Sequence, residues 1–328
     1  MLKKIELENY RCYKKSSIRF KNIGIIVGRN NAGKSTIIEA LRIIAHAGKK
    51  SKTAQYVSPP RSIGIALQKG FLLDSKKLKI DLRSIIYLYD SAPYAKITAK
   101  FDDGSFIEVY LTKDVIFASV FDPKSKNIIQ KSMAQNLAIE KINILPQIGL
   151  IKENEKKLSE DTIKTDKDTY LSSRHFRNEL LLFKEDHFED FKAIAEETWP
   201  GLRILELNYV PGLDEYISLI IKDEKFAAEI GIMGSGIQMW IQMVWFISRC
   251  KGSDTIILDE PDVYMHPDMQ RKILEVVLRK FKQVIIATHS VEIIYGVDAE
   301  NIITIEKETK KIHYADSPME VEDIIDDI

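Results

Sequence analysis

The sequence predicts an α/β protein whose main sheet is a mixed sheet assembled from two distant segments of the chain. A compact apolar run at 23–27, a Gly-rich turn and a helical pattern lie near the start, and a helix–strand–helix–strand series lies near the end. Strands that alternate with helices are typical of a single sheet whose faces are covered by the helices that connect its strands. We expect a split core at 1–50 and 200–315, an inserted β-rich lobe with a short helical arm at 51–199, and an acidic tail at 316–328.

The composition is that of an ordinary globular protein. Hydrophobic residues make up 45% of the 328 residues and charged residues 29%. The 48 basic and 48 acidic residues give a formal net charge of zero, which excludes a uniformly basic nucleic-acid coat but allows a local basic face. Cys12 and Cys250 lack metal-ligand spacing, and no apolar run suits a signal peptide or a membrane span. We expect a soluble cytoplasmic protein with no membrane partner.

The first elements follow from apolar periodicity. Apolar and polar residues alternate over 2–8, which predicts a strand, and the continuous apolar run at 23–27 predicts a fully buried one. Apolar residues recur at helical spacing over 35–46 and predict a helix. The stretch 49–61 is basic and contains Ser and Pro, so we expect a loop there.

The rest of the chain divides by the same signals. Segments 96–101 and 105–110 flank Asp102-Asp103-Gly104, and this turn predicts a hairpin because Gly accepts a positive φ. Residues 151–198 are polar with interleaved apolar positions and predict helices. The remainder predicts strands at 202–209 and 215–221, a helix at 235–249, a strand at 255–258, a helix at 267–281, a strand at 284–287, and a last hairpin of 302–305 with 311–314.

The strongest motif is Gly28-Arg29-Asn30-Asn31-Ala32-Gly33-Lys34-Ser35, which matches G-x-x-x-x-G-K-[ST] between a buried strand and a helix start. Such a loop wraps backbone N–H groups around phosphates, and the helix N-terminus adds its positive dipole end. We predict that Lys34 reaches the β- and γ-phosphates and that Ser35 is a Mg²⁺ ligand. The predicted nucleotide-binding residues of this segment are Gly28, Asn30, Asn31, Ala32, Gly33, Lys34, Ser35 and Thr36.

Two carboxylates end the apolar strand at 255–258. Asp259 and Glu260 are followed by Pro261. If this strand lies next to the strand at 23–27, it brings Asp259 beside the metal, directly or through water. Glu260, one residue further, is then placed to polarise an attacking water as general base. A solvated acidic turn is the alternative interpretation.

Two further features complete the pattern. Gly234-Ser235-Gly236 opens an apolar helix and offers a second anion site at a helix N-terminus. One triphosphate has no use for two such sites in one chain, so we expect a second copy to supply the second site. His289 ends another buried strand, and its place after the other motifs predicts a sensor of the γ-phosphate. A simple Ser-capped helix and a structural His are the alternatives.

These segments carry a family resemblance. The set GRNNAGKS, GSGIQ, IILDEPDVYMHP and IIATHS resembles the ABC-type ATPase heads of the SMC, RecF and OLD group, and Glu8-Asn9-Tyr10-Arg11 is similar to that group's first-strand motif. The likeness is greatest to OLD-like AAA family ATPases without a Toprim nuclease domain, many of which belong to bacterial antiphage defence systems. The segments at 145–149 and 173–178 also resemble this subgroup, and the resemblance extends over nearly the whole chain.

The resemblance implies how the motifs work together. In such heads two subunits sandwich two ATP molecules, each held by the phosphate loop of one copy and the signature helix of the other. Arg11 touches ATP from the first strand, and His289 senses the phosphate. Gln147 is the candidate that couples the metal to the inserted lobe, with Gln130 and Gln135 as alternatives. The signature contacts in trans are assigned to Gly234, Ser235, Gly236 and Gln238, and the loop across the dimer to Asp262.

Two departures refine the implied function. The signature reads GSGIQ instead of LSGGQ, which argues against a transporter, and the residues after His289 are too few for a Toprim domain. We expect a slow, regulatory ATPase with ATP and Mg²⁺ as cofactors. It dimerises, or assembles further, and controls a separate nuclease or toxin effector in antiphage defence. The alternative is a RecF- or SMC-like DNA-binding repair or recombination ATPase. Its phosphate contacts would come from the basic residues Lys49, Lys50, Lys52, Arg61, Lys69, Lys76, Lys77 and Lys79, for which a solvated loop is the default interpretation.

Overall fold

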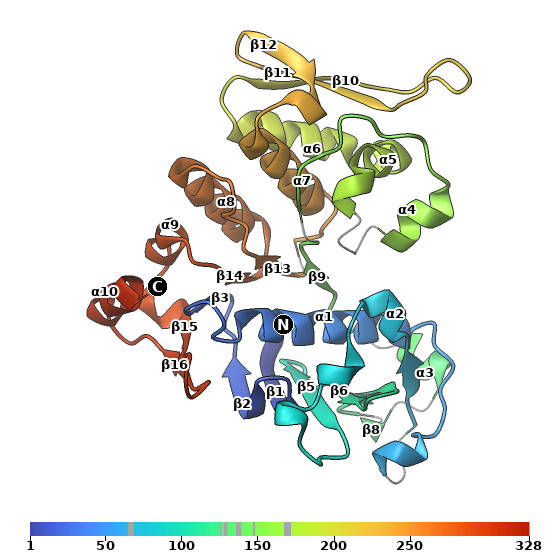
Figure 1. Ribbon diagram of the computed structural model, residues 1–328, viewed down its shortest axis with the longest axis vertical. Helices are drawn as coiled ribbons and strands as arrows, with labels where there is room; N and C mark the ends of the chain where they lie inside the picture. Colours follow the sequence, from blue (N-terminus) through green and yellow to red (C-terminus); the bar gives the residue numbers. More distant parts are fainter. Residues whose placement is uncertain are drawn as a thin grey trace. The chain divides into compact units, whose positions relative to one another are not determined.

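The computed structural model describes residues 1–64, 69–124, 126–127, 130–135, 139–146, 148–166, 172–252 and 254–327. The chain divides into two compact units (Figure 1). The first unit comprises Met1–Asn143, Ser253–Leu258 and Phe281–Ile328, and the second comprises Ile144–Gly252 and Asp259–Lys280.

The first unit contains a seven-stranded sheet with the order β2-β1-β5-β6-β7-β4, and β8 pairs with β7. Each of its strands pairs with its neighbours in the antiparallel sense. The alternation of apolar and polar residues explains why 2–10 forms strand β1: Leu2, Ile5 and Leu7 are fully buried, while the residues between them are not. The strands are β1 Leu2–Tyr10, β2 Tyr13–Arg19, β4 Phe71–Leu73, β5 Ala95–Phe101, β6 Phe106–Leu111, β7 Ile116–Asp122 and β8 Lys126–Asn127.

A second, six-stranded sheet has the order β16-β15-β3-β14-β13-β9. Strand β3 pairs in parallel with both β14 and β15, and β16 pairs with β15 in the antiparallel sense. This sheet joins an N-terminal strand to C-terminal strands, so the predicted mixed α/β sheet and its last hairpin are confirmed. The strands are β3 Ile23–Val27, β9 Ile142–Ile144, β13 Thr255–Asp259, β14 Gln283–Ala287, β15 Ile302–Ile305 and β16 Ile312–Tyr314.

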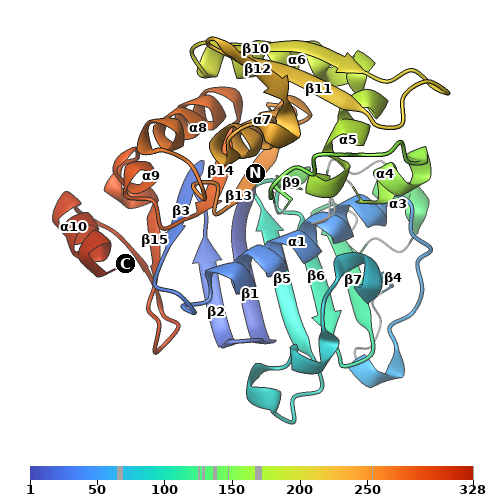
Figure 2. The same cartoon turned by 45° about the horizontal axis from the view of Figure 1, so that its top comes forward.

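Helix α1, Lys34–Ser51, contacts strands of both sheets and crosses one face of the antiparallel sheet (Figure 2). It extends beyond the predicted end at residue 46, because buried positions continue through Ala47, Gly48 and Ser51. At Gly48 an added Cβ would lie 3.3 Å from Ile139 Cγ2, which shows how tightly this end packs. A helix buried on several faces is stabilised mainly by tertiary packing.

One glutamine joins the two sheets of the first unit. The side chain of Gln283, at the start of β14, is only 1% exposed. Its Nε2 donates to Leu2 O at 2.8 Å and to Lys21 O at 2.9 Å, and its Oε1 accepts from Leu2 N at 2.9 Å. Thr255 Oγ1 donates to the same Oε1 at 2.7 Å. A buried amide whose atoms are hydrogen-bonded in this way specifies how the strands pack.

Strands β5, β6 and β7 do not form a lobe separate from the N-terminal segment. Strand β5 pairs directly with β1, in a register that sets Leu7 opposite Ile97 and Ile5 opposite Ala99. The sequence grouped these strands with the insertion at 51–199, whereas hydrogen bonding places them in the sheet that β1 begins. Strand pairing over such a sequence distance is not encoded in the periodicity of either segment.

The second unit combines helices with a three-stranded antiparallel sheet of order β10-β11-β12. Helix α6 packs against α7 and against β10. The apolar side chains of α7 explain its position, since twelve of its residues are buried, including Trp240 and Trp245. The elements are α4 Glu160–Asp166, α5 Phe176–Leu182, α6 Lys184–Thr198, β10 Leu202–Asn208, β11 Ser218–Asp223, β12 Phe226–Glu229, α7 Ser235–Ser248 and α8 Pro267–Lys280.

Short helices and turns complete the two units, and the predicted acidic tail at 316–328 contains one of these helices. None of the helices in the described part of the chain is both long enough and apolar enough to cross a bilayer. The remaining α-helices are α2 Ser75–Leu78, α3 Lys131–Gln135, α9 Val291–Tyr295 and α10 Pro318–Asp327. The 3₁₀ turns are η1 Arg61–Ile63, η2 Leu82–Ser84, η3 Tyr87–Tyr89, η4 Ser172–His175, η5 Ile230–Ile232 and η6 Ala299–Asn301.

Candidate nucleotide-binding site

The Gly-rich loop connects β3 to α1 in the first unit, as the motif requires. Two of its glycines have no room for a side chain. A Cβ at Gly28 would lie 2.8 Å from Ile305 O, and one at Gly33, whose φ is +118°, would lie 2.5 Å from the Tyr13 hydroxyl. Gly33 adopts the left-handed conformation that favours glycine. The backbone of this loop is therefore held close to its neighbours, and its conformation depends on both glycines.

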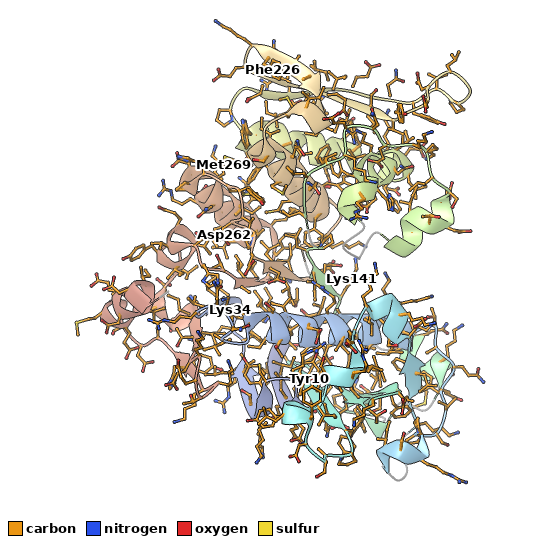
Figure 3. The ribbon with its side chains drawn as sticks, viewed as in Figure 1. Tyr10, Lys34, Lys141, Phe226, Asp262 and Met269 are labelled. Carbon is orange, nitrogen blue, oxygen red and sulfur yellow. The ribbon has the colours of Figure 1, made fainter. Side chains whose placement is uncertain are left out.

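Lys34 begins α1, and its side chain is directed to the loop (Figure 3). It is 6% exposed, and its Nζ donates to Gly28 O at 2.6 Å. The same Nζ lies 2.7 Å from Nε2 of His289, which follows the end of β14. A charged ammonium only donates, so Nε2 accepts here and the ring proton belongs on Nδ1. The fold thus brings together two predicted site residues that are far apart in sequence.

The rest of the loop offers donors to an anion. Asn30, Asn31 and Ser35 are exposed, and Lys310 Nζ donates to Asn31 O at 2.6 Å. Among the described residues, no side chain caps the N-terminus of α1, and its first turn contains no acidic residue. The N-terminal amides and the positive dipole end of an 18-residue helix therefore face this loop. The loop and Ser35 fit a phosphate group with its divalent cation.

The other two predicted loop residues are less open. Ala32 is buried at 1% exposure. Thr36 is half-buried, and the Cys12 thiol donates to its Oγ1 at 3.6 Å. Cys12 lies between β1 and β2, so this contact and the approach of Tyr13 to Gly33 join the first hairpin to the start of α1. Neither Cys12 nor Tyr13 stood out in the sequence, because no motif marks them.

Arg11 lies in the turn between β1 and β2 and forms an ion pair with Glu39 of α1. Its Nε donates to Glu39 Oε1 at 2.6 Å and its Nη2 to Glu39 Oε2 at 2.8 Å, while Nη1 donates to Ser84 Oγ at 2.8 Å. The Tyr10 hydroxyl also donates to Glu39. Burial, with the adjacent Glu39 carboxylate, raises the pKa of Tyr10 well above its ordinary value. Arg11 is therefore anchored to the helix that begins with Lys34.

This anchoring gives a prediction. Glu39→Gln removes the bidentate ion pair, and we expect it to lower the free energy of unfolding by about 1–2 kcal/mol. Thermal or urea denaturation measures this loss. The prediction that Arg11 also touches ATP requires Arg11→Lys to weaken ATP binding by calorimetry more than Glu39→Gln does. If the two substitutions weaken ATP binding equally, Arg11 only positions α1 and does not contact ATP.

The strand that ends in Asp259 is not adjacent to the strand of the phosphate loop. Strand β14 lies between β3 and β13, so the condition under which Asp259 was expected beside the metal, direct adjacency of its strand to β3, is not met. The two strands have similar continuous apolar patterns, and periodicity cannot order them within a sheet. The direct neighbour of β3 is the strand that leads to His289, which explains the contact between His289 and Lys34.

Glu260 and Asp262 belong to the second unit, where they follow β13. Glu260 is exposed and has a φ of +46°, a left-handed conformation that costs a residue with a Cβ about 1–2 kcal/mol. Asp262 (labelled in Figure 3) is half-buried, and its carbonyl accepts from Met265 N at 3.0 Å. Gln147 lies outside the described residues, and its alternatives Gln130 and Gln135 are both exposed.

The signature residues lie at the N-terminus of α7. Gly234 and Ser235 are exposed, and a Cβ added at Gly234 would meet no described atom within 4 Å. Gln238, which is predicted to contact the nucleotide in trans, is 4% exposed in this chain. Its Oε1 accepts from Ile151 N at 2.7 Å, and its Nε2 donates to Met233 O at 2.7 Å. The side chain of Gln238 thus joins the residue before the signature to the segment at Ile151.

Arg177 is a structural residue to which the sequence analysis assigned no role. It is fully buried, and its Nε and Nη2 donate to Glu229 at 2.6 and 2.5 Å. Its backbone N donates to Glu155 Oε2 at 3.0 Å, and Glu229 Oε2 accepts from Gly231 N at 2.7 Å. This ion-paired cluster fixes η5, the turn just before the signature. An arginine among the buried positions of α5 is the signal that could have revealed it.

Comparisons with known proteins show the family and the fold of the chain. The family model of the AAA ATPase domain matches residues 1–196 and 146–294. No curated protein matches the chain. Among solved structures, an Smc head bound to the C-terminal winged-helix domain of ScpA covers 96% of this chain and 97% of its own, with a TM-score of 0.63 and 17% identity.

Two other solved structures are similar. An Smc head domain from Pyrococcus furiosus with an extended coiled coil, bound to the C-terminal domain of ScpA, has a TM-score of 0.60 and 16% identity over 99% of this chain and 98% of its own. The SMC head domain from Thermotoga maritima has a TM-score of 0.53 and 15% identity over 96% and 99%. These likenesses establish an SMC-head type of fold, and the family match establishes more: the chain belongs to the AAA ATPase domain family.

Proposed function

We propose that this protein binds and hydrolyses ATP with Mg²⁺, and that two copies close around the nucleotide. The observation that carries the proposal is the buried Lys34 ammonium, held at the mouth of the loop by Gly28 O and His289 beside the uncapped start of α1. A cation beside the amides of a helix N-terminus suits the charge of a triphosphate.

The chain's own residues divide the work. Lys34 and the loop amides hold the phosphates, and His289 reports the terminal phosphate through its contact with Lys34. Ser35 and Asp259 are the proposed metal ligands, and Glu260 orients water and takes its proton. Mg²⁺ supplies neutralisation of the phosphate charge when bound. The strained backbone at Glu260 supports a functional role, because such strain is typical of catalytic positions.

The surface around the signature supports closure with a second copy. Gly234 and Ser235 are exposed, and Ser235 begins a 14-residue helix whose amides suit a phosphate. Nearby segments of the second unit expose apolar side chains, with Ile232 at 67%, Val263 at 41% and Tyr264 at 69%. Exposed apolar groups around a polar anion site are typical of a surface that a partner covers.

Ser235→Arg tests this closure. We expect the variant to bind ATP normally but to remain monomeric, because the added side chain fills the N-terminus of α7 where the phosphate of the other copy docks. Light scattering with ATP measures the dimer, and calorimetry measures ATP binding. Ser62→Arg, at an exposed position of η1, is the matched control and should dimerise like the wild type. An ATP-dependent dimer of undiminished affinity in Ser235→Arg would refute the proposed contact.

We further propose that ATP turnover is slow and controls a separate nuclease or toxin in bacterial antiphage defence. The resemblance of DEPDVYMHP and GSGIQ to OLD-like ATPases supports this role. Co-purification with the product of the neighbouring gene, and phage protection that Lys34→Ala abolishes, would test it.

A DNA-binding clamp is the second candidate, supported by the exposed Lys49, Lys50 and Lys52 around the end of α1. An affinity for duplex DNA that requires ATP and falls with salt would favour it.

A further inference from the structure

A pocket in the first unit, separate from the phosphate loop, has the chemistry of an anion-binding site. It has a volume of about 660 Å³, within the range of small-molecule sites. It lies among β1, β2, the β5–β6 turn and the β15–β16 hairpin, and Figure 1 shows this hairpin beside β2. Ile23 lines it at the start of β3, whereas the loop follows the end of that strand, about 15 Å away at the usual rise per residue.

The floor of the pocket is apolar and ordered. Phe20, Phe101 and Ile303 line it and are 6%, 4% and 2% exposed. Phe106 also lines it and stacks on Phe121, with ring centroids 4.2 Å apart. Tyr314 forms one wall, and its hydroxyl accepts from Arg19 N at 2.7 Å, which joins β16 to β2. This floor suits a flat or aliphatic body rather than an inorganic ion.

The rim is strongly basic, although the whole chain has no net charge. Glu6 accepts from Lys4 Nζ at 2.6 Å and from Lys100 Nζ at 2.9 Å, and Lys21 pairs with Glu300 at 3.1 Å. Burial opposes ionisation of Glu6, but the hydrogen bonds from the two lysines lower its pKa. The five cationic side chains that line the pocket are Lys3, Lys4, Arg19, Lys21 and Lys100.

Two of these cations are available to a ligand. In the part of the chain that the structure describes, neither Lys3 nor Arg19 forms a side-chain ion pair or hydrogen bond. Both are exposed at the rim, on the neighbouring strands β1 and β2. Free cations above an aromatic floor attract an anion whose remaining part is apolar.

We propose that this pocket binds an amphipathic organic anion, in which a flat or aliphatic body carries a phosphate, sulfonate or carboxylate. The body packs on Phe20, Phe101 and Ile303, and the anionic group meets Lys3 and Arg19. The site is distinct from the ATP site and does not depend on the proposed function.

Titration of the full-length protein with 1-anilinonaphthalene-8-sulfonate, an apolar aromatic anion, tests the proposal. We expect one fluorescent site per chain, with binding that weakens at high salt. Lys3→Glu/Arg19→Glu should weaken it by about tenfold or more, since two attractive charges become repulsive. Lys14→Glu/Lys15→Glu is the matched control, because it makes the same charge change at exposed positions of β2 outside the pocket. This control and Lys34→Ala, which alters the ATP site, should leave the affinity unchanged.

Competition then distinguishes the sources of the anion. Displacement by adenosine monophosphate in the Lys34→Ala protein would indicate a nucleotide-like phosphate, and displacement by decanoate an acyl carboxylate. Equal affinity in the two double variants, or binding that salt leaves unchanged in the wild type, would overturn the proposal. The salt series uses the unaltered protein, so it remains decisive even if a variant fails to fold.

Discussion

Lys34→Ala is expected to weaken ATP binding by roughly 10- to 100-fold, the usual contribution of a charge-assisted hydrogen bond. The ammonium is 6% exposed and already held at the loop by Gly28 O at 2.6 Å, so little side-chain entropy is lost when it meets a phosphate. Truncation removes this charge and leaves the carbonyl of Gly28 and Nε2 of His289 without that donor. Isothermal titration calorimetry measures the change directly.

A second lysine, which contacts the same loop from the β15–β16 turn, is the control. Lys310 Nζ donates to Asn31 O at 2.6 Å, so it touches the loop but does not belong to its motif. We expect Lys310→Ala to change ATP affinity less than threefold, as is usual for an exposed polar contact. Unaltered ATP affinity in Lys34→Ala would show that Lys34 does not bind the phosphates. Equal losses of ATP affinity in Lys34→Ala and Lys310→Ala would indicate a nonspecific effect of charge.

Glu260→Gln is expected to lower the rate of ATP hydrolysis by roughly 10²- to 10⁴-fold, the usual contribution of a general base. Gln keeps the size of the side chain but accepts no proton, so the variant still binds ATP. If hydrolysis releases the partner, as the proposed function requires, we expect the ATP-bound dimer to accumulate. Gln also has a Cβ, so the substitution leaves the strain at a φ of +46° unchanged, and an effect on folding is not expected.

Phosphate release at saturating ATP and light scattering together test this prediction. Glu275→Gln, at an exposed position of α8 in the same unit, is the matched control and should hydrolyse ATP like the wild type. Hydrolysis that continues at the wild-type rate in Glu260→Gln would mean that another group activates the water. If Glu260→Gln loses hydrolysis but forms no stable dimer, the role of Glu260 as general base is supported and the closure of two copies around ATP is contradicted.

Local motifs made part of this site predictable. The eight residues from Gly28 to Ser35 are contiguous, and the buried strand before them and the amphipathic helix after them are both visible as periodic patterns. The geometry of such a loop depends on short-range sterics, above all at Gly28 and Gly33, where the structure leaves no room for a Cβ. A short segment that encodes its own turn can be interpreted from sequence alone.

Contacts across the sheet were not predictable in this way. Periodicity indicates that 255–258 and 283–287 are buried strands, but it does not indicate that β14 lies next to β3, with β13 beyond it. From the sequence, the strand of Asp259 and the strand before His289 are equally good neighbours for β3, and only the fold shows His289 Nε2 at 2.7 Å from Lys34 Nζ. Order within a parallel sheet results from tertiary packing of similar apolar strands.

By itself, the sequence determined the α/β class, the phosphate loop and the strand–helix alternation that joins the two ends of the chain. Only the tertiary structure shows that Arg11 forms an ion pair with Glu39, that Gln283 joins two sheets, and that Arg177 stabilises the turn before the signature. The physical reason is sequence distance. A motif is specified by neighbours along the chain, whereas a buried polar contact exists only after strands and helices have packed and left each group with its particular partner.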